Sequence, residues 1–250
     1  MCRMFAVRSD VPVRVDRAFE GLQRLAEEHR HGWGVVHFDG QAPWLETSVV
    51  SAQACPRFER LGEEVATTSL LAHIRLASVG EVDDRNNHPF LGEGWAFMHN
   101  GTLRCFDRHR AELEREIAPR WRAQLRGDTD SERCFALFLT YLDGRREADL
   151  QVATAALTRA LQVAAAVCDR DAPAGAASAL NFIASDGRRL LATRRGRTLF
   201  RASRPGARFL ASEHLWEGEA WEEIPEEGVV AIDADLSLRA SRLSDWSARG

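Results

Sequence analysis

The sequence predicts a single-domain, layered sandwich of α-helices and β-sheets. Strand-like segments lie toward both ends of the chain and helical segments lie between them, which departs from the strict strand–helix alternation of a doubly wound parallel sheet. The chain has 250 residues, of which 45% are hydrophobic and 28% are charged, and these values are typical of a protein with a packed core. We therefore expect sheets built from both ends of the chain, with helices covering them.

The first part of the chain contains two predicted strands with a helix between them. Residues 2–7 suit a short strand at the very start of the sequence. Residues 16–29 carry apolar side chains at helical spacing with charges between them, which predicts an amphipathic helix. Residues 31–38 are typical of a strand that opens with glycine and ends in a turn.

The central part contains two buried strands and two helices. Residues 69–76 and 95–98 are mostly apolar, which predicts buried strands. Residues 77–94 between them are polar and contain glycine, as a loop that forms a site would be. Residues 107–122 and 131–142 show helical patterns, and the second follows a capping-box sequence.

The last part combines a buried helix with a run of short strands. Residues 150–167 are rich in alanine and apolar around most of the helix, which predicts a helix enclosed by the protein. A Pro/Gly/Ala linker over residues 169–178 separates it from strands that would complete a sheet, so one domain is expected. The predicted strands are residues 180–184, 189–193, 199–202, 209–211 and 229–232.

Composition excludes several classes of chemistry. All 33 basic residues are arginine, so mechanisms that need lysine, such as a Schiff base or a phosphate-binding loop ending in Gly-Lys, are excluded. The net charge of −4 provides no basic footprint for nucleic acid, and no run approaches the roughly 18 apolar residues of a membrane helix. The five cysteines lack CxxC spacing and the N-terminus lacks a signal peptide. We expect a reduced, cytoplasmic protein without a metal, a cofactor, a nucleic-acid partner or a membrane.

Cys2 is the most informative single residue. Removal of Met1, which a small residue at position 2 permits, would leave a thiol and a free α-amine on Cys2. The amine has a reference pKa of about 8 and can act as the base for its own thiol, so no histidine partner is needed. A cysteine at position 2 can also be incidental, whereas lipidation would need an upstream apolar segment that the sequence lacks.

Three further segments could complete a site around this thiol. Arg75 ends a predicted buried strand and can form a two-point contact with a carboxylate. Asn100 and Gly101 end another buried strand, where a side-chain amide and a backbone N–H can form an oxyanion hole. Asp130 lies at a predicted helix N-terminus and could receive a substrate ammonium.

The remaining histidines and cysteines have plainer interpretations. His73 is expected to be a buried core residue, and His88 and His99 lack the close spacing of metal ligands. The other cysteines are interpreted as core or incidental thiols, namely Cys55, Cys105, Cys134 and Cys168.

A thiol, a carboxylate clamp, an ammonium acceptor and an oxyanion hole together describe a site that recognises glutamine. The sequence resembles the class II glutamine amidotransferases, which have an N-terminal nucleophile, and in particular their compact stand-alone bacterial members, over about residues 2–235. The segments that carry the resemblance are Cys2, Arg75-Leu-Ala-Ser78-Val-Gly80, His99-Asn100-Gly101, Asp128-Thr-Asp130-Ser-Glu132, Gly32-Trp33-Gly34, Asn87-His88-Pro89-Phe90 and Ala211-Ser-Glu213, followed by Trp221 and Ile224-Pro225.

The resemblance implies an α+β, four-layer αββα sandwich and one amidotransferase domain over residues 2–250. Cys2 would attack the side-chain amide of glutamine or of a γ-glutamyl compound, and Asn100 and Gly101 would stabilise the oxyanion. Arg75 would hold the α-carboxylate and Asp130 the α-amino group. Ser78, which stands where the large synthases carry threonine, would make a supporting contact.

Three functions remain open at this stage. The expected one is a free-standing cysteine amidohydrolase that forms a γ-glutamyl thioester and hydrolyses it with water. A glutaminase subunit that delivers ammonia to a separate protein partner would use the same residues, because 250 residues leave no room for a synthase domain. A non-catalytic module that binds a γ-glutamyl ligand is the third, although such a module would be expected to have lost Cys2 or Asn100.

Overall fold

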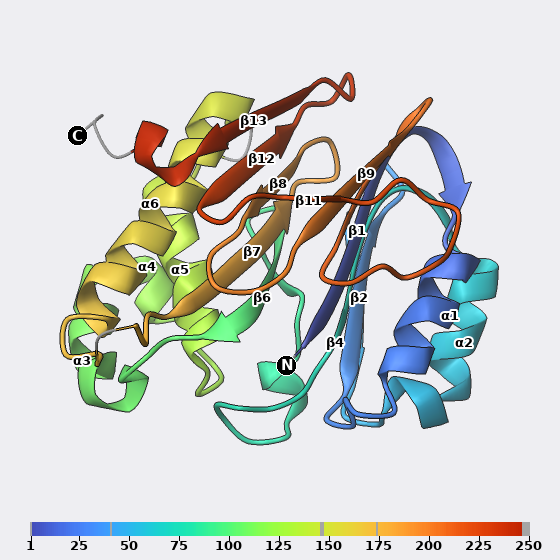
Figure 1. The fold of residues 1–250 in the computed structure, drawn as a ribbon. Helices are drawn as coiled ribbons and strands as arrows, with labels where there is room; N and C mark the ends of the chain where they lie inside the picture. Colours follow the sequence, from blue (N-terminus) through green and yellow to red (C-terminus); the bar gives the residue numbers. More distant parts are fainter. Residues whose placement is uncertain (1, 41, 146–147, 174, 247–250) are drawn as a thin grey trace.

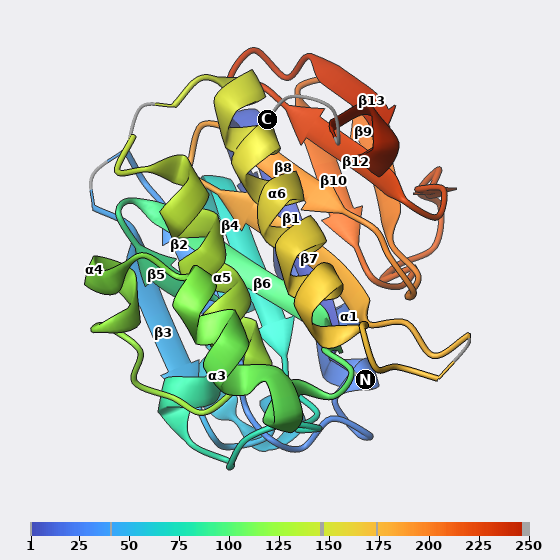
Figure 2. The same ribbon diagram turned by 90° about the vertical axis from the view of Figure 1, so that its left-hand side faces the viewer.

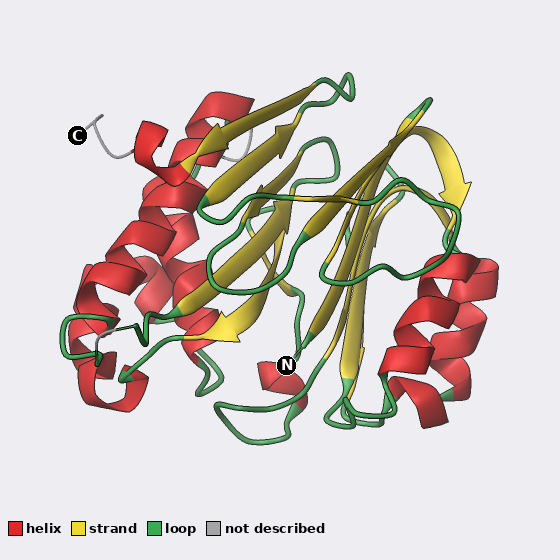
Figure 3. Ribbon diagram, viewed as in Figure 1, coloured by secondary structure: helices red, strands yellow, loops and turns green. Residues whose placement is uncertain are grey.

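Two antiparallel β-sheets pack face to face, and helices cover both outer faces (Figures 1 and 3). The computed structural model describes residues 2–40, 42–145, 148–173 and 175–246. Every strand pair within these ranges is antiparallel. The predicted four-layer αββα sandwich is therefore confirmed.

The first sheet is built from both ends of the chain, as expected. Its seven strands follow the order β11-β9-β10-β1-β4-β2-β3, so the N-terminal strand lies in the middle. The bounds are β1 Arg3–Arg14, β2 Trp33–Phe38, β3 Trp44–Ser48, β4 Ala66–Ile74, β9 Phe200–Arg204, β10 Ala207–Ala211 and β11 Glu222–Glu223.

The second sheet has six strands in the order β13-β12-β8-β7-β6-β5. Their bounds are β5 Phe90–Gly92, β6 Trp95–Thr102, β7 Ala179–Ser185, β8 Leu190–Thr193, β12 Gly228–Ile232 and β13 Leu238–Arg242.

Helices α1 and α2 cover the first sheet, and the other four helices lie against the second (Figures 1 and 2). Three short 3₁₀ segments complete the fold. The bounds are α1 Asp16–Leu25, α2 Pro56–Glu64, α3 Phe106–Glu116, α4 Pro119–Arg122, α5 Asp130–Leu142, α6 Leu150–Cys168, η1 Ala52–Ala54, η2 Asp84–Asn86 and η3 Leu243–Trp246.

The buried apolar side chains form three clusters. One lies between the two sheets, one lies between the first sheet and its helices, and one lies between the second sheet and its helices. On β1, Phe5 and Val7 pack under α1 and α2, whereas Met4 and Ala6 pack between the sheets. On β6, Phe97 packs under the helices on the other side and Met98 packs between the sheets. The cause is the two-residue period of a strand, which sends successive side chains to opposite faces.

Several element boundaries differ from the sequence-based expectation. β1 continues to Arg14 rather than ending near residue 7, and β3, α2 and β13 were not predicted. The single helix expected over residues 107–122 is two helices, α3 and α4. They are separated at Ala118, whose ψ of 139° is extended, because the residue before a proline is disfavoured in the helical region.

Among the described residues, helix α6 is long and apolar enough, by length and composition only, to cross a membrane, with a mean hydropathy of 1.3 over an 18-residue window. It is not the continuous apolar run of about 18 residues that the sequence analysis excluded, because Gln151, Arg159 and Gln162 interrupt it. The core helix of a folded protein meets the same criterion, and 56% of this window is buried inside the protein.

The pairing of β6 with β7 generates a stability prediction. A Cβ on Gly101 would lie 1.8 Å from the carbonyl oxygen of Ala179, so only glycine fits without moving the backbone. Gly101→Ala should lower the free energy of unfolding by about 3 kcal/mol, measured by urea denaturation. Gly92→Ala is the control, because a Cβ there makes only ordinary contacts at 3.4 Å. Equal effects of the two substitutions would contradict the steric account.

Candidate active site

The candidate site lies where the beginning of β1 meets the ends of β4 and β6. β1 and β4 are antiparallel with Arg3 opposite Ile74, so Cys2 lies beside the end of β4. β6 belongs to the other sheet and packs against both strands. The two sheets therefore bring together the cysteine at position 2 and two distant strand ends.

Strand alternation directs the key side chains into the space between the sheets. Cys2 shares a face of its strand with Met4, which packs between the sheets. Asn100 shares a face with Met98, and Arg75 shares a face with Leu71, and both of these apolar residues belong to the same inter-sheet cluster. Because strand side chains alternate with period two, all three functional candidates point to the same layer.

Hydrogen bonds connect the motifs that the sequence singled out. The Sγ of half-buried Cys2 donates to the carbonyl oxygen of Leu76 at 3.6 Å. The hydroxyls of Ser78 and Thr102 lie 3.0 Å apart, which links the loop after β4 to the end of β6. The N–H of Leu103 then donates to Oδ2 of Asp130 at 2.7 Å. The expected site residues are thus brought together in one region.

Arg75 holds the loop that follows β4. Its guanidinium donates from Nη1 to the carbonyl oxygen of Glu81 at 2.9 Å and from Nη2 to that of Val79 at 3.2 Å. Its backbone is fixed in turn, since Arg75 N donates to Gly32 O at 2.8 Å. The side chain is 3% exposed. A guanidinium has five N–H donors, so the contacts to the loop leave donors for a ligand.

Asn86 and Asp128 fasten this loop to the segment before α5, and the sequence analysis had assigned neither a role. Asn86 Nδ2 donates to Asp128 Oδ1 at 2.6 Å and to the carbonyl oxygen of Glu81 at 3.1 Å. Asp128 N donates back to Asn86 Oδ1 at 3.1 Å. Gly80 is needed here, because its φ is +75° and a Cβ would lie 2.5 Å from Asp128 Oδ1.

Asn100 and Gly101 end β6 with two potential donors. Asn100 is 3% exposed, and its side-chain amide makes no hydrogen bond within the described part of the chain. Gly101 lets the backbone approach Ala179 closely. A side-chain amide without a protein partner, beside a backbone N–H, is the arrangement that can stabilise a negative oxygen.

The neighbouring His99 is a structural residue. Its Nε2 lies 3.0 Å from the carbonyl oxygen of Ala179 and must donate, because a carbonyl can only accept. Its Nδ1 therefore accepts from the hydroxyl of Ser131 at 2.9 Å. Burial lowers the pKa of His99, which keeps the ring neutral in this role. Within the described residues no group of three or more His, Cys, Asp or Glu side chains could hold a metal ion.

Asp130 is a buried carboxylate at the N-terminus of α5. It is 2% exposed and also accepts from Ser131 N at 2.8 Å. The partial positive charge of a helix N-terminus favours an anion at this position. Thr129 caps the helix by accepting from Glu132 N at 3.2 Å, as the capping-box sequence predicts. Glu132 differs from a standard capping box, since its carboxylate accepts from the N–H groups of residues 126 and 127.

The environment of Cys2 favours the neutral thiol. Burial raises its pKa, and the carboxylate of Asp130 acts in the same direction, while the positive charge of Arg75 opposes both. A thiol in this state needs a base to become a nucleophile. The expected removal of Met1, which would supply an α-amine as that base, concerns a residue outside those that the structure describes.

His73, two residues before Arg75 on β4, forms a buried pair with His88. His73 is fully buried, as expected for a core histidine, and its Nε2 lies 3.0 Å from Nδ1 of His88. Burial, with a smaller contribution from the charge of Arg75, lowers the pKa of His73 to about 3. The pKa of His88 is lowered well below its usual value by burial and by His73.

The sequence comparisons agree with one family. The profile described as glutamine amidotransferases class-II matches residues 1–231. A gamma-glutamyl-hercynylcysteine sulfoxide hydrolase of Mycobacterium tuberculosis is 26% identical over 202 residues, covering 80% of this chain and 74% of the hydrolase. A glutamine–fructose-6-phosphate aminotransferase of Rhizobium meliloti is 34% identical over 152 residues, covering 59% of this chain and 24% of the aminotransferase.

Other relatives and solved structures extend the comparison. The chain spans about half the length of several curated relatives, for example 48% of a Haemophilus influenzae protein provisionally named a glutamine amidotransferase, with 29% identity. A class-II domain protein from Silicibacter pomeroyi has a similar structure, with a TM-score of 0.71 at 23% identity, covering 97% of this chain and 99% of that one. The glutamine phosphoribosylpyrophosphate amidotransferase of B. subtilis gives a TM-score of 0.71 at 16% identity, covering 97% of this chain and 49% of that one.

The histidine pair predicts how stability depends on pH. His73 is neutral in the folded protein down to a pKa of about 3, whereas in the unfolded chain it titrates near 6.5. Protonation therefore favours unfolding, and this contribution to stability is present above about pH 6.5 and is lost as the pH falls toward 3. Between those values wild type should lose about 1.4 kcal/mol per pH unit more than His73→Gln, measured by urea denaturation.

The exposed His214 provides the matched control for this measurement. His214→Gln removes an exposed imidazole and so controls for the loss of a histidine as such. If His73→Gln and wild type had parallel stability curves from pH 6 to pH 4, the buried imidazole would not be neutral in the folded state.

Proposed function

The chain belongs to the class II glutamine amidotransferases, and from that premise we propose that it is a cysteine amidohydrolase that cleaves a γ-glutamyl amide. The observation that carries the proposal is that Cys2, Asn100 and Asp130 lie near one another at one end of the layer between the sheets. A series of hydrogen bonds links their segments: Cys2 to Leu76, Ser78 to Thr102, and Leu103 to Asp130. A cysteine, an unpaired amide donor and a buried carboxylate together suit a substrate that carries both a carbonyl and an ammonium.

The proposed reaction has two steps. The α-amine of Cys2, free once Met1 is removed, takes the thiol proton, and Sγ attacks the amide carbon. The C–N bond then breaks, the proton passes to the leaving amine, and a γ-glutamyl thioester remains on Cys2. Water attacks the thioester with the same amine as base, which releases the γ-carboxylate and restores the thiol. The raised pKa of the Cys2 thiol supports the need for an adjacent base.

The remaining residues would recognise the substrate and stabilise charge. Asn100 Nδ2 and Gly101 N–H would donate to the tetrahedral oxyanion. The unused N–H groups of Arg75 would bind the α-carboxylate, and Asp130 would accept from the α-ammonium, since carboxylate oxygens have further lone pairs. Ser78 would support substrate binding indirectly, because its hydrogen bond to Thr102 holds the loop after β4 in place.

The comparisons favour a free-standing hydrolase over a synthase subunit. The mycobacterial relative, which by its name hydrolyses a γ-glutamyl conjugate, matches along 74% of its length. The aminotransferase matches along only 24% of its length. A γ-glutamyl conjugate with a bulky leaving group is therefore our preferred substrate class over free glutamine.

Replacement of the nucleophile tests the proposal. Cys2→Ala should abolish the release of glutamate from γ-glutamyl amides and leave the thermal midpoint within a few degrees of wild type. Cys55→Ala, a half-buried thiol at the start of α2, is the matched control and should retain activity. Activity that survives in Cys2→Ala would remove the nucleophile assignment, and a wild type that binds but never cleaves would make the chain a γ-glutamyl-binding module.

Asn100→Ala tests the oxyanion donor. Loss of one donor should lower kcat by about 10²–10³ with little change in KM, because the hydrogen bond strengthens in the transition state. Steady-state kinetics with a γ-glutamyl anilide separate the two parameters. A change in KM alone would make Asn100 a ground-state contact.

The alternative is a glutaminase that passes ammonia to a protein partner. It predicts that the isolated chain leaves glutamine intact and that cleavage appears only when the partner is added. Turnover of γ-glutamyl amides by the isolated protein distinguishes the proposed hydrolase from this alternative.

A further inference from the structure

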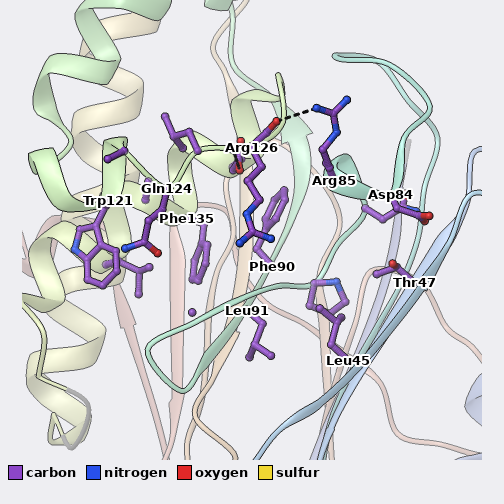
Figure 4. A pocket seen from close by; sticks show the side chains of 18 residues that line it. Leu45, Thr47, Asp84, Arg85, Phe90, Leu91, Trp121, Gln124, Arg126 and Phe135 are labelled. Atoms are coloured by element: carbon purple, nitrogen blue, oxygen red, sulfur yellow. Dashed lines mark hydrogen bonds between the residues drawn. The ribbon is translucent and has the colours of Figure 1, made fainter.

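A cavity lies at the edge of the sandwich and is lined by residues other than those assigned to the candidate active site. It has a volume of about 600 Å³ and is lined from the edge strands β3 and β5 and from α4 and α5 (Figure 4). Cavities of this size accommodate small organic ligands. Its lining residues are Leu45, Thr47, Asp84, Arg85, Asn87, Pro89, Phe90, Leu91, Gly92, Trp121, Ala123, Gln124, Leu125, Arg126, Glu132, Phe135, Ala136 and Leu139. Cys2, Arg75, Asn100 and Asp130 are not among them.

Apolar and aromatic groups form much of the wall. The rings of Phe90 and Phe135 are stacked, with centroids 6.1 Å apart and an interplanar angle of 13°. Trp121 lines the same space from α4, and Leu91 and Leu139 line it from β5 and α5. Walls of this kind bury a flat apolar body, for which aromatic side chains supply large contact areas.

The acidic groups at the cavity already make hydrogen bonds or ion pairs within the protein. Glu132 accepts from the N–H groups of residues 126 and 127 and pairs with Arg133 at 3.0 Å. Asp84 accepts from Asn87 Nδ2 at 3.2 Å. Arg85 is likewise engaged, since it forms an ion pair with Asp83 at 2.9 Å. Glu132 and Arg85 are therefore ion-paired within the protein, whereas the exposed Asp84 is hydrogen-bonded only to a neutral amide and keeps its negative charge.

Arg126 is an exposed cationic residue of the lining. Its guanidinium makes no hydrogen bond or ion pair with any residue that the structure describes. Figure 4 shows this side chain running from the rim toward Phe90, into the cavity. The cavity thus combines apolar walls with the unpaired guanidinium of Arg126, and Asp84 adds a negative charge at another part of the lining. In addition, Oδ1 of Asn87, a lining residue that is 3% exposed, is buried and unpaired within the described chain.

We propose that this cavity is a binding site for a small amphipathic anion, an aromatic body that carries one carboxylate. The aromatic body packs against Phe90, Phe135 and Trp121, and the carboxylate pairs with Arg126. Planar guanidinium and carboxylate groups match one another in a two-point hydrogen bond. The proposal does not depend on the reaction at Cys2, because Cys2, Arg75, Asn100 and Asp130 do not line this cavity and the test measures binding.

The test uses two probes of similar shape, the anion 1-naphthaleneacetate and the neutral 1-naphthaleneacetamide, whose amide replaces the carboxylate by a group that also donates hydrogen bonds. Dissociation constants for the full chain are measured by isothermal titration calorimetry. Wild type should bind the acetate about tenfold more tightly than the acetamide. Arg126→Gln should remove this preference by weakening the acetate alone, whereas Arg122→Gln, an exposed arginine of α4 that does not line the cavity, should keep it.

A filling variant tests the location. Ala123 is exposed and lines the cavity, so Ala123→Trp should keep the fold, checked by thermal denaturation, and should abolish binding of both probes. Absence of saturable binding to wild type would overturn the proposal. Equal affinity for the two probes would overturn the role of Arg126, and unchanged binding to Ala123→Trp would show that the probes bind elsewhere.

Discussion

The buried carboxylate of Asp130 joins the helical layer to β6, and the geometry of the candidate site depends on this bond. An ionised carboxylate that is 2% exposed is costly unless hydrogen bonds and a favourable local charge compensate for the lost hydration. Here the compensation comes from the N–H groups of Leu103 and Ser131 and from the N-terminus of α5. Because Leu103 lies two residues after Gly101, the hydrogen bond from Leu103 N–H to Asp130 also fixes Asn100 and Gly101 relative to that carboxylate.

The two-sheet architecture explains how one layer can collect chemistry from distant parts of the chain. Along β1, β4 and β6, alternate side chains form the dry core between the sheets. The same alternation places the side chains of Cys2, Arg75 and Asn100 on the inward-facing side, at the ends of these strands. Cys2 is thus placed by the central strand of one sheet, and Asn100 and Gly101 are placed by a strand of the other. The loop after β4 is held in front of them by Arg75 and by the Asn86–Asp128 pair.

The sequence predicted the layers and the site motifs better than it predicted the connections among them. Cys2, Asn100 and Asp130 could be singled out because each residue type carries a recognisable chemistry at a strand end or a helix start. The Asn86–Asp128 pair could not, because its only signal is two polar residues 42 positions apart in loops. β1 was predicted too short because Val11 is 60% exposed and Pro12 interrupts the pattern, although pairing with β4 resumes at Val13. The cavity beside Arg126 arises from four separate segments, and no local pattern predicts such a meeting.

The central claim is that Cys2 is a nucleophile in a pocket shaped for a γ-glutamyl group. The most direct measurement is the intact mass of the protein before and after incubation with a diazoketone analogue of glutamine, followed by peptide mapping. The account predicts that the chain lacks Met1 and gains the mass of one adduct, located on Cys2. It also predicts that an excess of a γ-glutamyl amide prevents this modification. A chain without Met1 that gains no adduct, or gains it on another cysteine, would contradict the account.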